Sequence, residues 1–274
     1  MRARSGRSAA SEIMTLLDPR WLRALCLLSV CLLPVSLALA QAKAAPGSES
    51  ILAGVLRWLP LVFSGFLFNL LVSVLSMALG TALGVGLGLG LIARGTPTRV
   101  MSLGAMQFFR NAPWLVLLFY AMFLIPYQIT LFGRTVPFPD WIKAVIGLAL
   151  PVMANISEIV RGGVLSIPAG QWESARGLAF TRRQILWLVI IPQAVRRMIP
   201  PWMNLYATLT MATPLISIVG VQDGLTMTRS ALVAEGRPEL FLPMYLALLI
   251  MFFAFCYPVA LTTRALERRF EAQT

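Results

Sequence analysis

The sequence predicts an all-α polytopic membrane protein, and three observations support this fold class. Of the 274 residues, 58% are hydrophobic and 12% are charged, whereas soluble proteins carry about 25% charged residues. The mean hydropathy is +0.79. Runs without a charged residue extend over 24–42, 58–93, 111–133, 144–157, 198–222 and 240–263. Most of these runs reach the roughly 20 residues that a helix needs to cross a bilayer.

The basic residues divide unequally between the two sides of the membrane. Seventeen of the 23 lie in the N-terminal segment, in residues 94–110, in residues 161–197 and in the C-terminal tail, which the positive-inside rule makes cytoplasmic. Cytoplasmic and external segments then alternate without contradiction along one N-terminal span and five core spans. These spans lie near 22–40, 66–93, 104–126, 143–163, 198–219 and 240–263. The net charge of +12 comes mostly from arginine at the ends of spans, so we do not expect nucleic acid as a partner.

The first span has two interpretations. The A-L-A sequence that ends at Ala40 fits a signal-peptidase site after a basic segment and an apolar stretch. The long basic segment and Pro34 instead suit an uncut membrane anchor. Both interpretations leave an external linker over residues 41–57. The predicted divisions are an N-terminal extension, a core and a cytoplasmic tail, over 1–64, 65–266 and 267–274.

The second span carries glycine at helical spacing. Gly80, Gly84 and Gly88 recur at every fourth residue, and small residues at this spacing let two helix backbones approach closely in lipid. We expect these glycines to pack against another helix of the same chain, with a subunit interface as the alternative.

The composition excludes several kinds of chemistry. The sequence has no histidine, which rules out serine–histidine pairs, cysteine–histidine pairs and histidine-ligated metals. Cys26, Cys31 and Cys256 lie in apolar runs without metal-ligand spacing. Since no nucleophile–base pair is evident either, the sequence predicts neither an enzyme nor a metal or cofactor site.

A long polar stretch separates the fourth and fifth spans on the predicted cytoplasmic face. Residues 171–178 predict two helical turns, and Thr181 suits the N-cap of a second helix that begins at Arg182. A short helix pair of this kind suits the docking of a soluble partner. An interfacial amphipathic loop without a partner would have the same pattern.

The same stretch resembles the EAA loop of ABC-importer permeases, whose pattern is E-A-A, three residues, G, nine residues, I-x-L-P. Here Glu173, Ser174 and Ala175 are followed at that spacing by Ala179 and by the V-I-I-P sequence that ends at Pro192. Four further motifs resemble the polar amino acid (histidine/glutamate/glutamine-type) branch of the family. They are FRNAP at 109–113, EIVRGG at 158–163, PAGQWE at 168–173 and SIVGV at 217–221.

The resemblance covers about residues 65–266 and implies a type I ABC importer transmembrane domain. It implies a permease subunit of a bacterial inner membrane that imports a polar amino acid. Its implied partners are two cytoplasmic ATPase subunits, a second permease subunit (a paralogue or a second copy), a periplasmic amino-acid-binding protein and membrane lipid. The rival hypothesis is an ion-driven secondary transporter, which would predict inverted repeats and buried carboxylates that the sequence does not show.

The resemblance also assigns an ATPase-coupling loop. Glu173 would pair with a basic group of the ATPase, or alternatively with Arg176 on its own helix. Ala179 replaces the family's glycine, and we expect alanine to be tolerated there if the turn keeps a negative φ. The predicted loop residues are Gly170, Glu173, Ser174, Ala175, Gly177, Ala179 and Pro192.

Polar groups within the spans are candidates for the translocation path. Glu158, the only acid we place inside a span, shares a helix face with Arg161, which predicts a structural or gating ion pair. Where the family reads K-D-T-S-L, residues 211–215 read MATPL, and Pro214 predicts a kink. The candidate path residues are Asn111, Asn155, Thr208, Thr210, Thr213 and Ser217.

Overall fold

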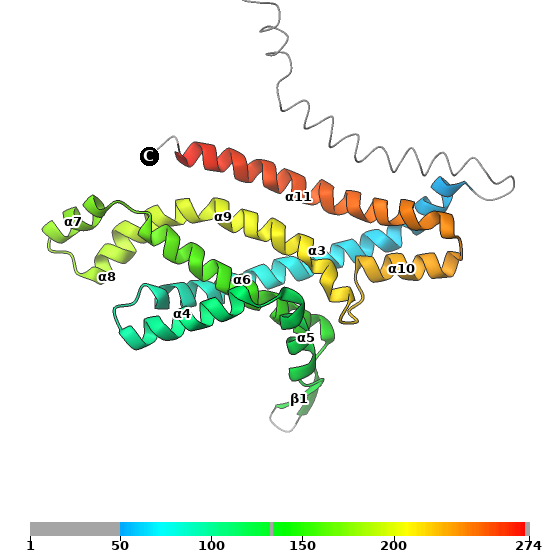
Figure 1. Cartoon of the computed structure of the whole chain (residues 1–274), viewed down its shortest axis with the longest axis horizontal. Coiled ribbons are helices and arrows are strands. Elements are labelled where there is room, and N and C mark those ends of the chain that lie inside the picture. Colours follow the sequence, from blue (N-terminus) through cyan, green and yellow to red (C-terminus); the bar gives the residue numbers. More distant parts are fainter. Residues whose placement is uncertain (1–49, 132–133, 272–274) are drawn as a thin grey trace, which may run out of the picture.

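The computed structural model describes residues 50–131 and 134–271, and the predicted span over 22–40 lies outside them. The described helices and strands follow one another as α3 (Ile51–Leu91), α4 (Thr96–Asn111), α5 (Trp114–Leu124), β1 (Gln128–Leu131), β2 (Arg134–Pro137), α6 (Asp140–Leu165), α7 (Ala169–Gly177), α8 (Arg182–Gln184), the π-helix η2 (Ile185–Ile190), α9 (Ile191–Ala212), the 3-10 helix η3 (Thr213–Ser217), α10 (Gly224–Glu235), the 3-10 turn η4 (Pro238–Leu240) and α11 (Phe241–Glu271). Figure 1 shows the long helices packed roughly parallel as one bundle.

Three of the described helices are long and apolar enough to cross a membrane: Ile51–Leu91, Asp140–Leu165 and Pro238–Arg268. Trp114–Leu124 is apolar but shorter. Helix α3 begins inside the linker that the sequence predicts over 41–57. Ser50 caps the start of this helix, because its hydroxyl accepts a hydrogen bond from the Ala53 amide at 3.2 Å.

The structure divides the predicted span over 104–126 into α4 and α5. Between them, Ala112 adopts an extended backbone (φ −72°, ψ 136°), as expected of a residue that precedes proline, here Pro113. Helix α5 turns away from the bundle and leads into the β1–β2 hairpin (Figure 1). The two strands pair antiparallel, with Gln128 opposite Pro137. This hairpin is a small β element that the sequence did not predict.

The contact between α3 and α6 confirms the predicted role of the glycines. A Cβ atom built on Gly80 or Gly84 would lie 2.5 Å from Val152 or Ile156 of α6. A Cβ on Gly88 would lie 2.7 Å from Val160. The backbone of α3 at these glycines therefore lies directly against side chains of α6 in the same chain. A larger residue in place of any of them would force the two helices apart.

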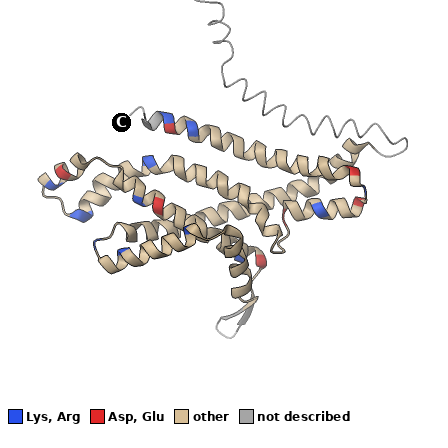
Figure 2. Cartoon of the chain, in the orientation of Figure 1, with Lys and Arg blue, Asp and Glu red and all other residues tan. Residues whose placement is uncertain are grey.

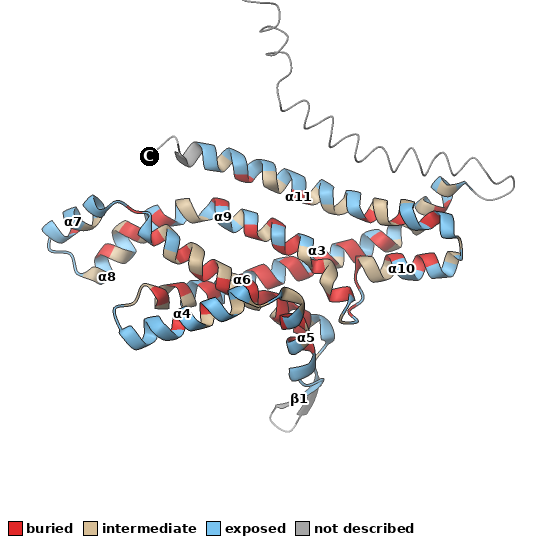
Figure 3. Cartoon of the chain, in the orientation of Figure 1, coloured by how far each residue is buried: buried red, intermediate tan, exposed pale blue. Residues whose placement is uncertain are grey.

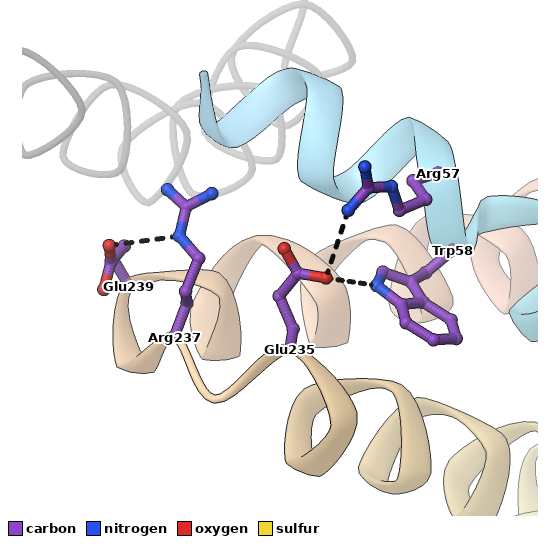
Figure 4. A network of polar contacts seen from close by, with 5 residues as sticks. All are labelled: Arg57, Trp58, Glu235, Arg237 and Glu239. Atoms are coloured by element: carbon purple, nitrogen blue, oxygen red, sulfur yellow. Dashed lines mark hydrogen bonds and ion pairs between the residues drawn. The ribbon is translucent and has the colours of Figure 1, made fainter. Parts of the chain in front are cut away.

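The opposite end of α3 packs against α10 and α11. Val62, Phe66, Leu240, Met244 and Leu248 form a buried apolar cluster there. The same helices also form polar contacts (Figure 4): the Glu235 carboxylate accepts a hydrogen bond from the Trp58 indole at 2.8 Å and lies 3.8 Å from Arg57. These contacts fix the start of α3 against the end of α10.

The charged residues agree with the predicted orientation. Figure 2 shows basic residues at the start of α4, on α7 and α8 and at the end of α11, all at one end of the bundle. These are the segments that the sequence assigns to the cytoplasm. Helix α6 is the most buried of the three membrane-length helices and α11 the least, so α11 presents most of its apolar surface outward (Figure 3).

Candidate functional site

Helix α7 projects from the end of α6 that the sequence assigns to the cytoplasm, and it is packed on one face only. Ala175 is 4% exposed and lies in a cluster with Ile167, Ile185 and Ile190. The other face is open to solvent (Figure 3). Leu178, just beyond the helix, is 70% exposed. The predicted two-turn helix over 171–178 is confirmed.

Both sides of α7 are tied to the membrane helices. Before it, the Arg197 guanidinium of α9 donates to the Ser166 carbonyl at 2.7 Å. After it, Arg182 donates to the Ile92 carbonyl at the end of α3 at 2.9 Å. Because three spans hold it, α7 is positioned to move with them as a rigid unit.

Glu173 lies on the open face of α7. In the described part of the chain its carboxylate forms no ion pair, so the alternative pairing with Arg176 is not made. Ser174 and Gly177 are likewise exposed, as is Gly170 near the start of the helix. The acid is therefore available to a group outside this chain.

The turn after α7 does not meet the condition, a negative φ, under which alanine was expected to be tolerated at position 179. Ala179 has φ +58°, in the left-handed region. The Phe180 amide donates to the Ala175 carbonyl at 3.2 Å and the Ala179 amide to the Arg176 carbonyl at 2.9 Å. This pair of bonds is a Schellman closure, which needs a left-handed residue at this point and usually uses glycine. The two hydrogen bonds hold Ala179 in the left-handed region, which a residue with a Cβ atom disfavours, so the turn is strained.

The second helix of the pair starts as the sequence predicts. The Thr181 hydroxyl accepts the Gln184 amide, and the Gln184 side chain accepts the Thr181 amide at 2.9 Å, which completes a capping box. The chain then forms the π-helix η2, which ends where the Ile191 amide donates to the Leu186 carbonyl. Pro192 follows and has no amide proton, so the α-helical bond from 192 to Leu188 cannot form.

A cavity of about 940 Å³ lies between α4, α6 and the α7–α8 pair. We call it the cytoplasmic cavity. It brings together three residues that the sequence proposes for two separate roles: Asn111, Glu158 and Arg161. Four further arginines line it: Arg94, Arg99, Arg110 and Arg182.

The predicted Glu158–Arg161 pair is present and well formed. Arg161 donates Nε to Glu158 Oε2 at 2.9 Å and a second guanidinium nitrogen to Oε1 at 2.6 Å. Both side chains are partly exposed to the cavity. By contrast, Arg94, Arg99 and Arg110 have no hydrogen bond or ion pair with the residues that the structure describes.

The other candidate path residues lie elsewhere. The Thr210 hydroxyl donates to the Tyr206 carbonyl, Ser217 to Pro214 and Asn155 to Pro151, so each is satisfied by its own helix. Thr208 is exposed and donates to the Asn204 carbonyl. None of these residues lines the cytoplasmic cavity. The bundle does change from α-helix to 3-10 helix at Thr213, where the sequence predicts a kink.

Thr213 belongs to a buried polar centre that joins α3, η3 and the start of α10. Asn69 donates to the Thr213 hydroxyl at 3.2 Å and to Asp223 Oδ2 at 3.1 Å, and its own oxygen accepts the Gly224 amide at 2.8 Å. Asp223 Oδ1 accepts the Thr226 amide and hydroxyl, both at 2.9 Å. Asn69, Thr213 and Asp223 are all 0% exposed.

This centre was not found by sequence reasoning, because its acid, Asp223, lies outside the predicted spans, inside which Glu158 is the only acid. Asp223 stands just beyond an uncharged run and has the pattern of a helix N-cap before Gly224, which was the available signal. Asn69 lies in the middle of an apolar run and gave no sign of its partner.

The sequence is similar to those of known membrane transport proteins. Residues 80–272 match the family described as "Binding-protein-dependent transport system inner membrane component". The chain is 30% identical over 213 residues to the L-cystine transport system permease protein TcyB of Bacillus subtilis (strain 168), covering 77% of this chain and 87% of that protein. It is 28% identical over 214 residues to the probable glutamine ABC transporter permease protein GlnP of the same organism, covering 77% and 94%.

The fold also matches a solved structure. A crystal structure of an amino acid ABC transporter with histidines superposes with a TM-score of 0.70 at 23% identity, covering 81% of this chain and 99% of that one. The shared helical order confirms the expected fold of a type I ABC importer transmembrane domain. Because the family match covers most of the chain, this multi-pass membrane protein belongs to the binding-protein-dependent transport system inner membrane components, the permease subunits of ABC importers.

Proposed function

We propose that this chain passes a polar amino acid across a bacterial inner membrane, with its movement driven by a cytoplasmic ATPase that docks on α7. The observation that carries the proposal is the exposure of Glu173 and Leu178 on a helix whose two sides are tied to three spans. Force applied to that exposed face reaches α3, α6 and α9 directly. The relatives that are named as cystine and glutamine permeases support an amino acid as the cargo.

The cytoplasmic cavity is the inner part of the proposed path. It combines Asn111 with the Glu158–Arg161 pair and lies beside Trp172 of α7. A movement of α7 would therefore change the shape of the cavity. We propose that the ion pair acts as a gate there, since both of its side chains face the open space.

The proposed assembly contains two ATPase subunits, a second permease subunit, a periplasmic binding protein and surrounding lipid. The apolar, outward-facing surface of α11 supports contact with lipid or with a second permease. An ion-driven secondary transporter finds no support. The additional buried acid, Asp223, is sealed from solvent and accepts three hydrogen bonds, so it is poorly placed to carry an ion.

The test is a charge reversal at Glu173. We expect Glu173→Lys to weaken co-purification of the ATPase and to reduce transport-linked ATP hydrolysis, while the chain still inserts in the membrane. The matched control is Arg229→Glu, an exposed reversal of equal size on α10 at the other end of the bundle. Wild-type association and transport in Glu173→Lys would refute the docking role of α7.

A further inference from the structure

Helix α9 contains two consecutive prolines, Pro200 and Pro201, near its middle. Proline has no amide proton, so the α-helical hydrogen bonds from these two positions to the carbonyls four residues earlier cannot form. Two successive bonds are therefore missing at one place, and a helix bends most easily at such a place. The prolines divide α9 into a first half (191–199) and a second half (202–212).

The second half of α9 is hydrogen-bonded to α3. The Trp202 indole donates to the Thr81 hydroxyl at 3.0 Å. One turn later, the Tyr206 and Ser73 hydroxyls share a hydrogen bond at 3.4 Å. Immediately beyond the second half, the buried polar centre adds a third bond from α3, at 3.2 Å. These contacts fix the second half of α9 on α3.

The first half of α9 is bonded to α7 and to the turn before it. The Gln193 side chain donates to the Gln171 side chain of α7 at 3.4 Å. Arg197 donates to the Ser166 carbonyl, just before α7, at 2.7 Å. Ala194 is 0% exposed and lies in the apolar cluster that also holds α7. Within the described part of the chain, no hydrogen bond joins this half to α3, so the partners of α9 change at the prolines.

A groove of about 390 Å³ beside Pro201 gives the first half space to move against α6. Gly162 of α6 lines the groove, and a Cβ atom added there would have no neighbour within 4 Å. Glu158 lines both this groove and the cytoplasmic cavity. A swing of the first half would therefore change the space on one side of the Glu158–Arg161 pair.

We propose that Pro200 and Pro201 form a hinge in α9, at which the first half swings with α7 while the second half stays fixed on α3. This inference rests on the proposed function and names the joint through which a movement of α7 reaches the Glu158–Arg161 pair. The first half is about 13 Å long, so a bend of about 20° at the hinge displaces its start by about 5 Å.

The test measures distances between spin labels in the full permease–ATPase complex in lipid nanodiscs, with the three native cysteines replaced by alanine. Val74→Cys with Val195→Cys reports movement of the first half relative to α3. Val74→Cys with Met211→Cys is the matched control on the second half, and all three side chains are exposed. Between the nucleotide-free complex and the complex trapped with ATP, the first distance should shift by at least about 3 Å and the second by less than about 1 Å. Equal shifts, or no shift in either pair, would overturn the proposal.

Proline variants assign the movement to the hinge. Pro200→Ala with Pro201→Ala restores both amide donors and should reduce the shift of the first distance by at least about half. Pro201→Ala alone changes an exposed residue, restores one donor and should reduce the shift by a smaller amount. The control is Pro258→Ala, which removes an exposed proline from inside α11 and should leave the shift unchanged.

A full shift in both proline variants would overturn the proposal. Co-purification of the ATPase and ATP-driven uptake by the wild-type chain test the proposed function separately, because neither depends on where α9 bends.

Discussion

The buried polar centre and the cytoplasmic cavity treat polar groups in opposite ways. In the centre, Asn69 and Asp223 are sealed from solvent and every polar contact is made within the chain. In the cavity and on α7, Arg110 and Glu173 are exposed and form no hydrogen bond or close ion pair with the described residues. The difference suggests that one region holds helices together while the other is left open for ligands and partners.

The largest expected effect comes from removing the Asn69 side chain from the buried polar centre. Asn69→Ala removes the donor to Asp223 and the acceptor of the Gly224 amide, and it leaves both groups buried without that partner. We expect a loss of about 3 kcal/mol in unfolding free energy, because unsatisfied buried groups are expensive and charged ones more so. Thermal or denaturant unfolding of the purified complex measures this change.

The control for Asn69→Ala is Asn204→Ala, which truncates an exposed asparagine on α9. It should change the unfolding free energy by less than about 0.5 kcal/mol. If the two variants were equally stable, the centre would not be a stabilising element, and the comparison with the cavity would fail.

A smaller effect, and a stabilising one, is expected in the turn that follows α7. Ala179→Gly removes the steric cost of a left-handed alanine, at about 1–2 kcal/mol, and part of this gain is offset by the greater freedom of glycine in the unfolded chain. The net gain should be about 1 kcal/mol. Hydrogen exchange of the Phe180 amide, which closes the turn onto Ala175, should then slow by about fivefold.

Ala169→Gly provides the matched control, because Ala169 is exposed, begins α7 and does not have a positive φ. That variant should not slow exchange of the Phe180 amide. Equal exchange in wild type and Ala179→Gly would mean that the turn carries no strain worth relieving.

The sequence predicted those features that depend on neighbouring residues. The helix over 171–178 and the Thr181 cap follow from local pattern, and the glycines at spacing four follow from close helix packing. The sign of φ at Ala179 escaped prediction, because it depends on which carbonyls the turn closes on. The bonds from Asn69 to Asp223 escaped as well, since 154 residues separate the two and an apolar run hides the asparagine.

Part of the site was predicted and part was not. Glu158 and Arg161 are three residues apart on one helix, so their pairing follows from helical geometry. Their meeting with Asn111 and Arg110 depends on how α4 packs against α6, which spacing along the chain does not reveal. Thr210, Thr213 and Ser217, which the sequence proposes as path residues in the fifth span, are buried in the bundle. The partner of Thr213 was not anticipated, and that partner changes what its hydroxyl is expected to do.

The smallest expected effect is at Thr213. The sequence alone favoured a path-lining role, for which Thr213→Val would lower uptake at unchanged stability. In the structure the hydroxyl is 0% exposed, donates to the Thr210 carbonyl at 2.8 Å and accepts from Asn69 at 3.2 Å. We therefore expect Thr213→Val to lower the unfolding free energy by about 0.6 kcal/mol, the usual worth of an interhelical hydrogen bond in a membrane protein.

Thr208→Val separates the two roles, because Thr208 lies five residues away on the same span with an exposed side chain that bonds only to its own helix. Uptake and thermal stability should be measured on the same purified complex for both variants. Thr213→Val should reduce stability more than Thr208→Val does while uptake per folded complex stays the same. Reduced uptake with wild-type stability in Thr213→Val would place this hydroxyl on the path, and the buried centre would then serve transport as well as packing.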